Sequence, residues 1–499
     1  PNPVRADARP DLTPGHADME MFIDGRWVGA LGGATFDVLD PATGETIDSV
    51  PEAGPADVDA AIRSAETAFQ AWKATPVAER ARLQKAAARL MRENAEQLGR
   101  LLTRELGRPL AGAITEIQRS AELLDVYAEE GLRLHAEMPL TGVAGEKIII
   151  TREPAGVVIA ITPFNYPLTL LCFKLGAALM AGCTVVAKPA EDTPLSTLQL
   201  AELFQTAGYP TGCFNVVTGR GPDVGMQMIA HPTPRKIAFT GGTQAGKAIA
   251  AAAAGTMKRV TLELGGQCPA IVCADADIGA ASAAIARHAF ANSGQFCYRV
   301  NRVYVERPVY TRFLDALADR VLQLDVGNGL TSTCALGPLV NEKIYRNSER
   351  QIADARARGA TILTGGARLT GGLYDKGWFL PPTVIADAGP SSLIMTEETF
   401  GPVLGVAPFD HHSEALRLAN ATIYGLAAFV FSRNLATGLT LAERLEAGSV
   451  WINDIQRSNQ RAPFGGMKQS GIGREKGRYG VEDYLEYKTI YLTYDAELR

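Results

Sequence analysis

The chain has 499 residues, of which 46% are hydrophobic and 21% are charged, and its formal net charge is −5. This is the composition of an ordinary globular protein, and its acidic balance excludes binding to nucleic acid or an anionic membrane through bulk charge. A chain of this length is expected to fold as two or three domains. We therefore expect small-molecule ligands.

The N-terminal residues and the cysteines indicate where the protein works. Residues 1–19 are polar and lack the apolar core of a secretory signal, so we expect a flexible leader. The sequence contains no run of about 18 apolar residues, so we expect no membrane-spanning helix. The seven cysteines include no C-x-x-C pair, and the six histidines have no metal-site spacing. The sequence thus predicts a reduced, cytoplasmic protein without a metal.

The first predicted elements are helices. Helical periodicity runs over 56–135 and is interrupted at Pro76 and near 107–109. A two-stranded segment is expected around 138–153, because 147–151 is strongly β-forming.

Strands and helices alternate beyond Gly156, which predicts a parallel sheet covered on both faces, with ligands at the carboxyl ends of its strands. The expected strands are 156–161, 184–187, 214–217, 236–240 and 259–264, and the expected helices are 167–181, 195–207, 222–230 and 245–254. A second α/β region is expected from about 266 to 460. The tail ends in a β-forming segment, 488–493, which could pair with another sheet edge.

Three features suggest chemistry. The glycine-rich segment 240–246 follows a strand and opens a helix, where backbone can approach a diphosphate, although a plain strand-to-helix turn is the alternative. Cys297 is either a nucleophile or a small buried hydrophobe. Glu263 ends an apolar strand, where a carboxylate needs either a task or an ion-pair partner.

Seven motifs, in order, carry a resemblance to one family. They are PFNYP at 163–167, KPAE at 188–191, FTGGTQAG at 239–246, LELGG at 262–266, GQFC at 294–297, EETFGP at 397–402 and PFGG at 463–466. From about residue 20 to 495, the chain resembles the aldehyde dehydrogenase superfamily.

The resemblance implies an α/β fold with three parts. A Rossmann-type, NAD-binding domain is expected over 20–137 and 154–264, and an α/β catalytic domain over 265–462. A small β element made of 138–153 and 480–499 is expected to join the chains into a homodimer or a homotetramer.

The resemblance also implies the catalytic roles. The Cys297 thiolate attacks the aldehyde carbon, and the Asn165 amide and the backbone N–H of Cys297 stabilise the oxyanion. Glu263 activates water to hydrolyse the resulting thioester. Lys174 occupies a position proposed for proton relay, with a solvated helix lysine as the alternative. A coenzyme A-dependent acylating enzyme is disfavoured by Glu263, and a non-enzymatic relative would need neither Cys297 nor Glu263.

The implied cofactor is NAD. Lys188 and Glu191 are expected at the adenosine ribose, where Glu191 would repel the 2′-phosphate of NADP. Glu398 is expected at the nicotinamide ribose, with Phe400 beside it. The full predicted set is Thr162, Pro163, Phe164, Lys188, Glu191, Thr240, Gly241, Gly242, Gly246, Leu264, Gly265, Glu398 and Phe400.

The predicted substrate pocket is mainly aromatic, which favours an aldehyde with an apolar body. Its expected members are Tyr166, Thr169, Leu170, Phe173, Phe296, Tyr298, Gln456, Arg457, Ser458 and Phe464.

The tail motifs resemble succinate-semialdehyde dehydrogenases, and Ser458 matches a carboxylate-binding serine there. That subfamily's two arginines correspond to Phe173 and Ala291, so we expect semialdehydes to be the weaker substrates. Should a carboxylate nevertheless be bound, the candidate anchors are Arg457, Arg299 and Arg461.

Overall fold

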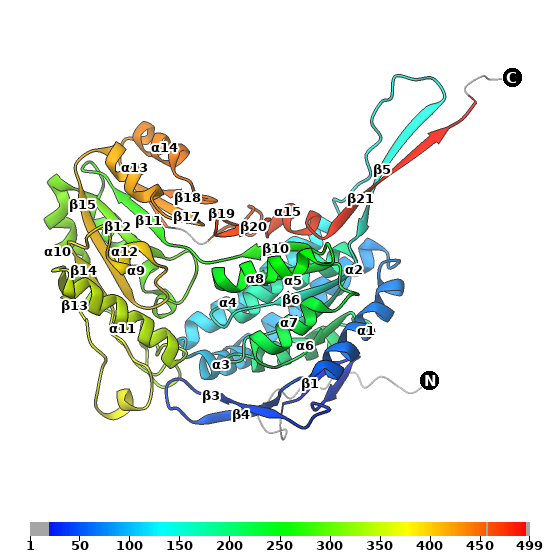
Figure 1. Ribbon diagram of the computed structural model, residues 1–499, viewed down its shortest axis with the longest axis horizontal. Helices are drawn as coiled ribbons and strands as arrows, with labels where there is room; N and C mark the ends of the chain where they lie inside the picture. Colours follow the sequence, from blue (N-terminus) through cyan, green and yellow to red (C-terminus); the bar gives the residue numbers. More distant parts are fainter. Residues whose placement is uncertain (1–18, 456–457, 496–499) are drawn as a thin grey trace.

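Two large β-sheets organise the molecule, and helices cover both of them (Figure 1). The computed structural model describes residues 19–455 and 458–495. Most of the predicted leader, the pocket residues Gln456 and Arg457, and residues 496–499 of the predicted β element lie outside the described residues.

The first sheet has eight strands in the order β2-β1-β8-β7-β6-β9-β10-β20. Strands β6 to β10 are parallel, whereas β1 and β20 join the ends of this parallel group in the antiparallel sense. The predicted strands are all present within two residues of their expected ends. The bounds are β1 Met21–Ile23, β2 Arg26–Val28, β6 Val157–Ile161, β7 Thr184–Lys188, β8 Phe214–Val216, β9 Lys236–Thr240, β10 Arg259–Glu263 and β20 Gly471–Ile472.

Eight helices pack with this sheet. Helix α5 begins with a proline in its first turn and ends at Gly182, whose φ of 95° suits glycine. An unexpected break separates α2 from α3 at Asn94, where the side-chain amide donates to the carbonyl of Leu90 at 2.8 Å. The bounds are α1 Pro55–Trp72, α2 Val77–Glu93, α3 Ala95–Leu106, α4 Leu110–Gly131, α5 Pro167–Ala181, α6 Leu195–Thr206, α7 Met226–Ala230 and α8 Thr243–Ala254.

The prediction of one helix over 222–230 is wrong in its first half. Residues Gly221–Gly225 form a π-helical turn, and α7 begins only at Met226.

The second sheet has seven strands in the order β13-β14-β15-β12-β11-β17-β18, and all but β13 run parallel to their neighbours. The strand bounds are β11 Cys268–Val272, β12 Val300–Glu306, β13 Thr361–Thr364, β14 Thr383–Ala386, β15 Val403–Phe409, β17 Ala427–Phe431 and β18 Ser449–Ile452. Its helices are α9 Ile278–Ala289, α10 Tyr310–Val321, α11 Glu342–Ala357, α12 Leu393–Thr396, α13 His412–Asn420 and α14 Leu435–Arg444.

Short elements complete the described chain. They are the hairpin β3 Thr35–Leu39 with β4 Thr46–Pro51, the pair β16 Tyr424–Gly425 with β19 Met467–Lys468, and α15 Gly477–Glu482. None of the helices within 19–455 and 458–495 is long and apolar enough to cross a membrane.

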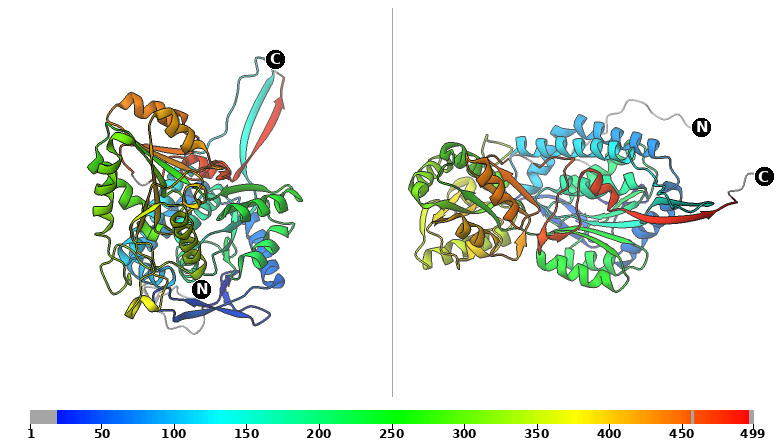
Figure 2. Two further views of the ribbon diagram at one scale, coloured as in Figure 1. Left: turned by 60° about the vertical axis from the view of Figure 1, so that its left-hand side comes forward. Right: turned by 90° about the horizontal axis from the view of Figure 1, so that it is seen from above.

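A two-stranded ribbon projects from the body (Figures 1 and 2). It consists of β5, Glu146–Pro154, and β21, Leu485–Thr493, paired antiparallel over their whole lengths. The expectation that 138–153 supplies both strands is wrong, because 138–145 forms no strand and the partner comes from the C-terminal tail. The predicted tail strand thus pairs with β5 of its own chain.

Candidate active site

The loop that carries Cys297 lies between α9 and β12 and has an unusual backbone. Asn292, Ser293 and Gly294 have φ values of 49°, 55° and 75°, so three successive residues are left-handed. This conformation is unfavourable for side chains other than glycine and persists only where surrounding contacts impose it. A Cβ atom at Gly294 would lie 2.2 Å from the carbonyl oxygen of Gly401, so glycine is required there.

Hydrogen bonds impose this loop conformation. The Asn292 amide donates to the backbone oxygen of Asn165 at 2.9 Å, and the Ser293 hydroxyl donates to the backbone oxygen of Gly337 at 2.8 Å. Asn165 lies in the loop between β6 and α5, so the first of these bonds joins the cysteine loop to the carboxyl end of the first sheet. The predicted nucleophile and the predicted oxyanion residue are thereby held next to one cavity.

This cavity has a volume of about 170 Å³, which is smaller than the pockets that hold drug-sized ligands. It contains every described member of the predicted pocket. From the predicted residues, its lining includes Asn165, Tyr166, Thr169, Leu170, Phe173, Phe296, Cys297, Tyr298, Ser458 and Phe464. Residues of the lining that were not predicted are Arg108, Thr115, Glu116, Arg119, His288, Ala291, Gln460 and Lys476.

Most polar groups of this lining are already satisfied or neutral. The Arg108 guanidinium contacts the Glu116 carboxylate at 2.6 Å, and the backbone N–H groups of Leu168 and Thr169 also donate to Glu116. Burial raises the pKa of Glu116 to about 7. Burial lowers the pKa of His288 to about 3, so its imidazole is neutral. Arg108, Glu116 and His288 therefore add little net charge to the wall around Cys297.

Glu263 ends β10 and is 3% exposed. Neither carboxylate oxygen has a hydrogen-bond partner among the described residues, so no structural ion pair explains its position. Burial, followed by the charge of Glu475, raises the pKa of Glu263 well above its usual range. Burial likewise raises the pKa of the Cys297 thiol, and the second cause is the charge of Glu263.

Lys174 is fully buried on α5, so the alternative of a solvated helix lysine is wrong. Its ammonium donates to Glu475 Oε1 and to Thr240 Oγ1, both at 2.6 Å. The second oxygen of Glu475 has no partner among the described residues. Glu475 therefore links Lys174 electrostatically to Glu263, and the motifs used on the sequence did not include it.

The predicted cofactor residues gather at the carboxyl ends of the parallel strands, where α/β sheets bind their ligands. Thr162, Pro163 and Phe164 follow β6, Lys188 and Thr240 end β7 and β9, and Leu264 and Gly265 follow β10. Gly241 and Gly242 precede α8, and Gly246 lies within it. Glu191 follows Lys188, and Glu398 and Phe400 lie between α12 and β15.

Glycines permit close packing around this edge. A Cβ atom at Gly246 would lie 2.4 Å from Leu264 Cδ2, and one at Gly265 would lie 2.4 Å from Glu398 Oε2. The backbone N–H of Gly266 donates to Glu398 at 3.0 Å.

The polar groups at this edge fit a dinucleotide. The buried hydroxyl of Thr162 has no hydrogen-bond partner in the described ranges. Among the described residues, the Lys188 ammonium donates only to the carbonyl of Pro189 and lies 4.0 Å from Glu191, and burial lowers its pKa to about 8. The N-terminus of α8 suits a diphosphate, and the carboxylates of Glu191 and Glu398 suit ribose hydroxyls.

Two of the arginines considered as carboxylate anchors lie elsewhere. Arg299 is fully buried and donates to the backbone oxygens of Ala289, Thr399 and Val403, so it braces the second sheet. Arg461 contacts Glu129 at 2.8 Å on the surface. Arg457 lies outside the described residues.

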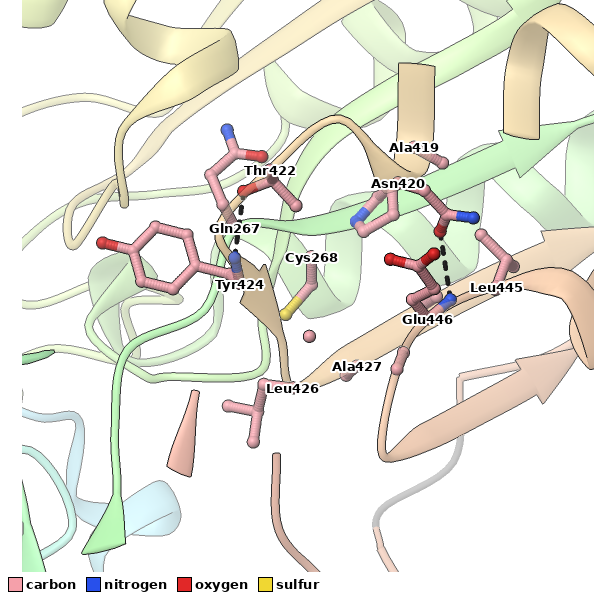
Figure 3. Close-up of a pocket in the computed structure, with 14 residues that line it drawn as sticks. Gln267, Cys268, Ala419, Asn420, Thr422, Tyr424, Leu426, Ala427, Leu445 and Glu446 are labelled. Atoms are coloured by element: carbon pink, nitrogen blue, oxygen red, sulfur yellow. Dashed lines mark hydrogen bonds between the residues drawn. The ribbon is translucent and has the colours of Figure 1, made fainter. Parts of the chain in front are cut away.

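A second, much smaller pocket is lined in part by Gln267 and Cys268 (Figure 3). Asn420, Thr422, Tyr424 and Glu446 line it, and two hydrogen bonds join them in pairs. Its volume of about 10 Å³ has room for about one water molecule. A pocket of this size cannot hold an aldehyde substrate.

One group of metal-ligating side chains also lies away from this cavity. Ligand atoms of Cys273, Glu306 and His412 lie within 4.8 Å of one another. One Glu306 oxygen already accepts a hydrogen bond from the backbone of Ala274 at 2.6 Å.

Comparisons with known proteins agree with the motifs. A model of the aldehyde dehydrogenase family matches residues 27–490. The chain is 43% identical over 473 residues to a glutarate-semialdehyde dehydrogenase of Pseudomonas aeruginosa, covering 95% of this chain and 97% of the relative. It is 42% identical over 473 residues to a 3-sulfolactaldehyde dehydrogenase of Pseudomonas putida, covering 95% and 96%.

A solved structure described as an NADP dependent enzyme of E. coli matches the fold with a TM-score of 0.93 and 41% identity, covering 96% of this chain and 98% of that one. The fold class and the reaction class expected from the seven motifs are thus confirmed. The chain belongs to the aldehyde dehydrogenase family and is an oxidoreductase that acts on aldehydes.

Proposed function

We propose that Cys297 is the nucleophile and Glu263 the general base in the NAD-dependent oxidation of an aldehyde to a carboxylate. The observation that carries this proposal is the cavity in which Cys297 and Asn165 lie together, with the unpaired carboxylate of Glu263 close enough to raise the pKa of the Cys297 thiol. An unpaired buried carboxylate is costly unless it has a function.

The reaction follows from these side chains. The Cys297 thiolate adds to the aldehyde carbon, and the Asn165 amide and the backbone N–H of Cys297 donate to the oxyanion that forms. When bound, the dinucleotide supplies the hydride acceptor that converts the adduct into a thioester. Glu263 then takes a proton from water, which attacks the thioester, and the carboxylic acid leaves as the thiol is regenerated.

Lys174 and Glu475 provide a place for the proton that Glu263 takes up. Glu475 and Lys174, in contact at 2.6 Å, are near enough to Glu263 for their charges to shift its pKa, and Glu475 has one oxygen free of described partners. We assign Lys174 and Glu475 to relay or to stabilise that proton.

For the cofactor, the relatives use NAD or NADP, and one solved relative is described as NADP dependent. Glu191 supports NAD here. Its side chain is 46% exposed beside the buried Lys188 ammonium, so its carboxylate can accept from ribose hydroxyls and repel a 2′-phosphate. A cytoplasmic location is proposed from the seven unpaired cysteines.

We also propose the domain division that was expected from the sequence. In this division, the ribbon of β5 and β21 is the element through which the chains associate. Side chains of β21 are largely exposed, including Tyr487 at 63% and Tyr491 at 75%. An isolated two-stranded ribbon with apolar side chains in water is marginally stable, and a second copy of the chain would cover it.

The first prediction concerns Cys297→Ala. We expect dehydrogenase activity to fall by more than about a thousandfold, because covalent catalysis is lost. Binding of NAD, measured by calorimetry, should be unchanged, because the cofactor groups lie on other elements. Residual activity above about a thousandth of the wild-type rate would contradict a thioester on Cys297.

The second prediction concerns Glu263→Gln. A burst of NADH equal to the active sites should survive in stopped flow, while steady-state turnover nearly stops, because only thioester hydrolysis needs the base. In the wild type, hydrolysis should speed up as pH rises, since burial raises the pKa of Glu263 and only the carboxylate accepts a proton. If the burst were lost as well, Glu263 would be needed before hydride transfer, to deprotonate the Cys297 thiol. Glu443→Gln, on the surface, serves as the control.

The third prediction concerns cofactor choice. Wild-type kcat/KM should favour NAD, and Glu191→Ser should shift the NADP-to-NAD ratio by roughly tenfold toward NADP, since a like-charge repulsion of about 1.4 kcal/mol is removed. The control is Glu443→Ser. Equal use of both cofactors by the wild type would refute the role of Glu191.

The fourth prediction concerns assembly. Light scattering at micromolar concentration should give two or four times the chain mass of 53.1 kDa. The double substitution Ile490→Asp and Leu492→Asp, which charges the ribbon, should lower that mass. A wild-type particle of 53.1 kDa would rule the assembly out.

A further inference from the structure

Lys476 places a buried ammonium in the cavity beside Cys297. The residue is 3% exposed, and it lines the same cavity as Cys297 and Phe173. Its Nζ lies 4.7 Å from the ring centre of Phe173 and 5.2 Å from that of Phe464. Two aromatic faces therefore hold the cation in place without neutralising it.

The hydrogen bonds of Lys476 also leave its charge uncompensated. The ammonium donates to Ser458 Oγ at 2.6 Å, and this is its one hydrogen-bond acceptor within the described ranges. An ammonium has three donors, so two remain for another ligand. The adjacent carboxylate, Glu475, is held by Lys174 at 2.6 Å instead.

The backbone of Lys476 is in a conformation that lysine rarely adopts. Its φ of 72° and ψ of 160° fall in a region that belongs almost entirely to glycine. Surrounding bonds impose this conformation, because Glu475 pairs with Phe464 in both directions at 2.8 Å and the N–H of Lys476 donates to the Tyr127 hydroxyl at 3.1 Å. Strain of this kind gathers at functional sites.

A second cation borders the same place. The Arg119 guanidinium lines the cavity and donates to the backbone oxygen of Ser458 at 3.0 Å, so Ser458 accepts from a cation at both its hydroxyl and its carbonyl. The nearest carboxylate partner of Arg119 is Glu122, at 3.8 Å and half exposed.

Arg119 is the charged neighbour with the largest effect on the pKa of Lys476. Burial, followed by the charge of Arg119, lowers the pKa of Lys476 to about 7. Glu475, Cys297 and Glu263 act in the opposite direction without offsetting the burial. An anion bound between the two cations would restore the charged form of Lys476.

We propose that Lys476, Ser458 and Arg119 form an anion-binding subsite that holds the far end of the aldehyde substrate. The preferred substrates are short aldehydes that end in a carboxylate or a sulfonate, and this inference rests on the proposed function of Cys297. It replaces the expectation that semialdehydes are the weaker substrates, which was based on the absence of arginines at Phe173 and Ala291. The positive charge comes instead from the C-terminal segment.

The test compares substrates that match in shape and differ in charge. Succinate semialdehyde and 4-methylpentanal have the same skeleton, and 3-sulfopropanal supplies the sulfonate. We expect wild-type kcat/KM to be higher for the anionic aldehydes. Lys476→Met should lower kcat/KM for them by about a hundredfold, mainly through KM, and change that for 4-methylpentanal by less than about threefold.

Two further variants separate charge from structure. Lys476→Arg keeps the charge and should retain most of the preference for anionic aldehydes. Arg478→Met removes one positive charge from an exposed site two residues away and should leave kcat/KM unchanged for both the anionic and the neutral aldehydes. The ratio of succinate semialdehyde to 3-sulfopropanal then tells which anion the subsite prefers.

The outcomes distinguish this inference from the proposed function. Equal loss of kcat/KM for charged and neutral aldehydes in Lys476→Met would show a structural or thiol-activating role and overturn the subsite. If Lys476→Met kept the wild-type preference for anionic over neutral aldehydes, that result would overturn the subsite as well. Failure of the wild type to oxidise any aldehyde would instead refute the proposed function.

Discussion

The buried ion pair between Lys174 and Glu475 is the contact on which the rest of the site depends. Lys174 belongs to α5 against the first sheet, and Glu475 belongs to the C-terminal segment that crosses beside it. Removing either partner would leave an uncompensated charge in the interior. The pair therefore fixes where that segment runs, and with it the positions of Phe464 and Lys476 around Cys297.

The sequence predicted the fold well where local signals are strong. The buried strands of the first sheet and helix α5 appear at their expected positions, because apolar runs, an initial proline and a final glycine determine them locally. The ribbon was harder, because the partner of β5 lies at the other end of the chain. No local pattern reports such a distant pairing.

The candidate site also has parts that local motifs predict and parts that depend on contacts between distant segments. Cys297, Asn165 and the aromatic residues were found from motifs, and all lie around one cavity. Lys476 and Arg119 were missed because a lysine after Glu475 and an arginine on α4 look like ordinary solvated side chains in sequence. Lys476 and Arg119 come together at Ser458 only in the folded chain. The motifs in the sequence therefore could not predict the positive charge of the substrate pocket.

The route of the C-terminal chain gives the projecting ribbon a consequence for catalysis. The short helix α15 is all that separates Lys476 from β21, and the carbonyl of Tyr484 accepts from the backbone of Ala155 at 3.0 Å where the ribbon starts. The ribbon strand and the segment that carries Glu475 and Lys476 are therefore parts of one continuous stretch of chain. In the proposed assembly, a second copy bound to the ribbon would also constrain the segment that carries Glu475 and Lys476.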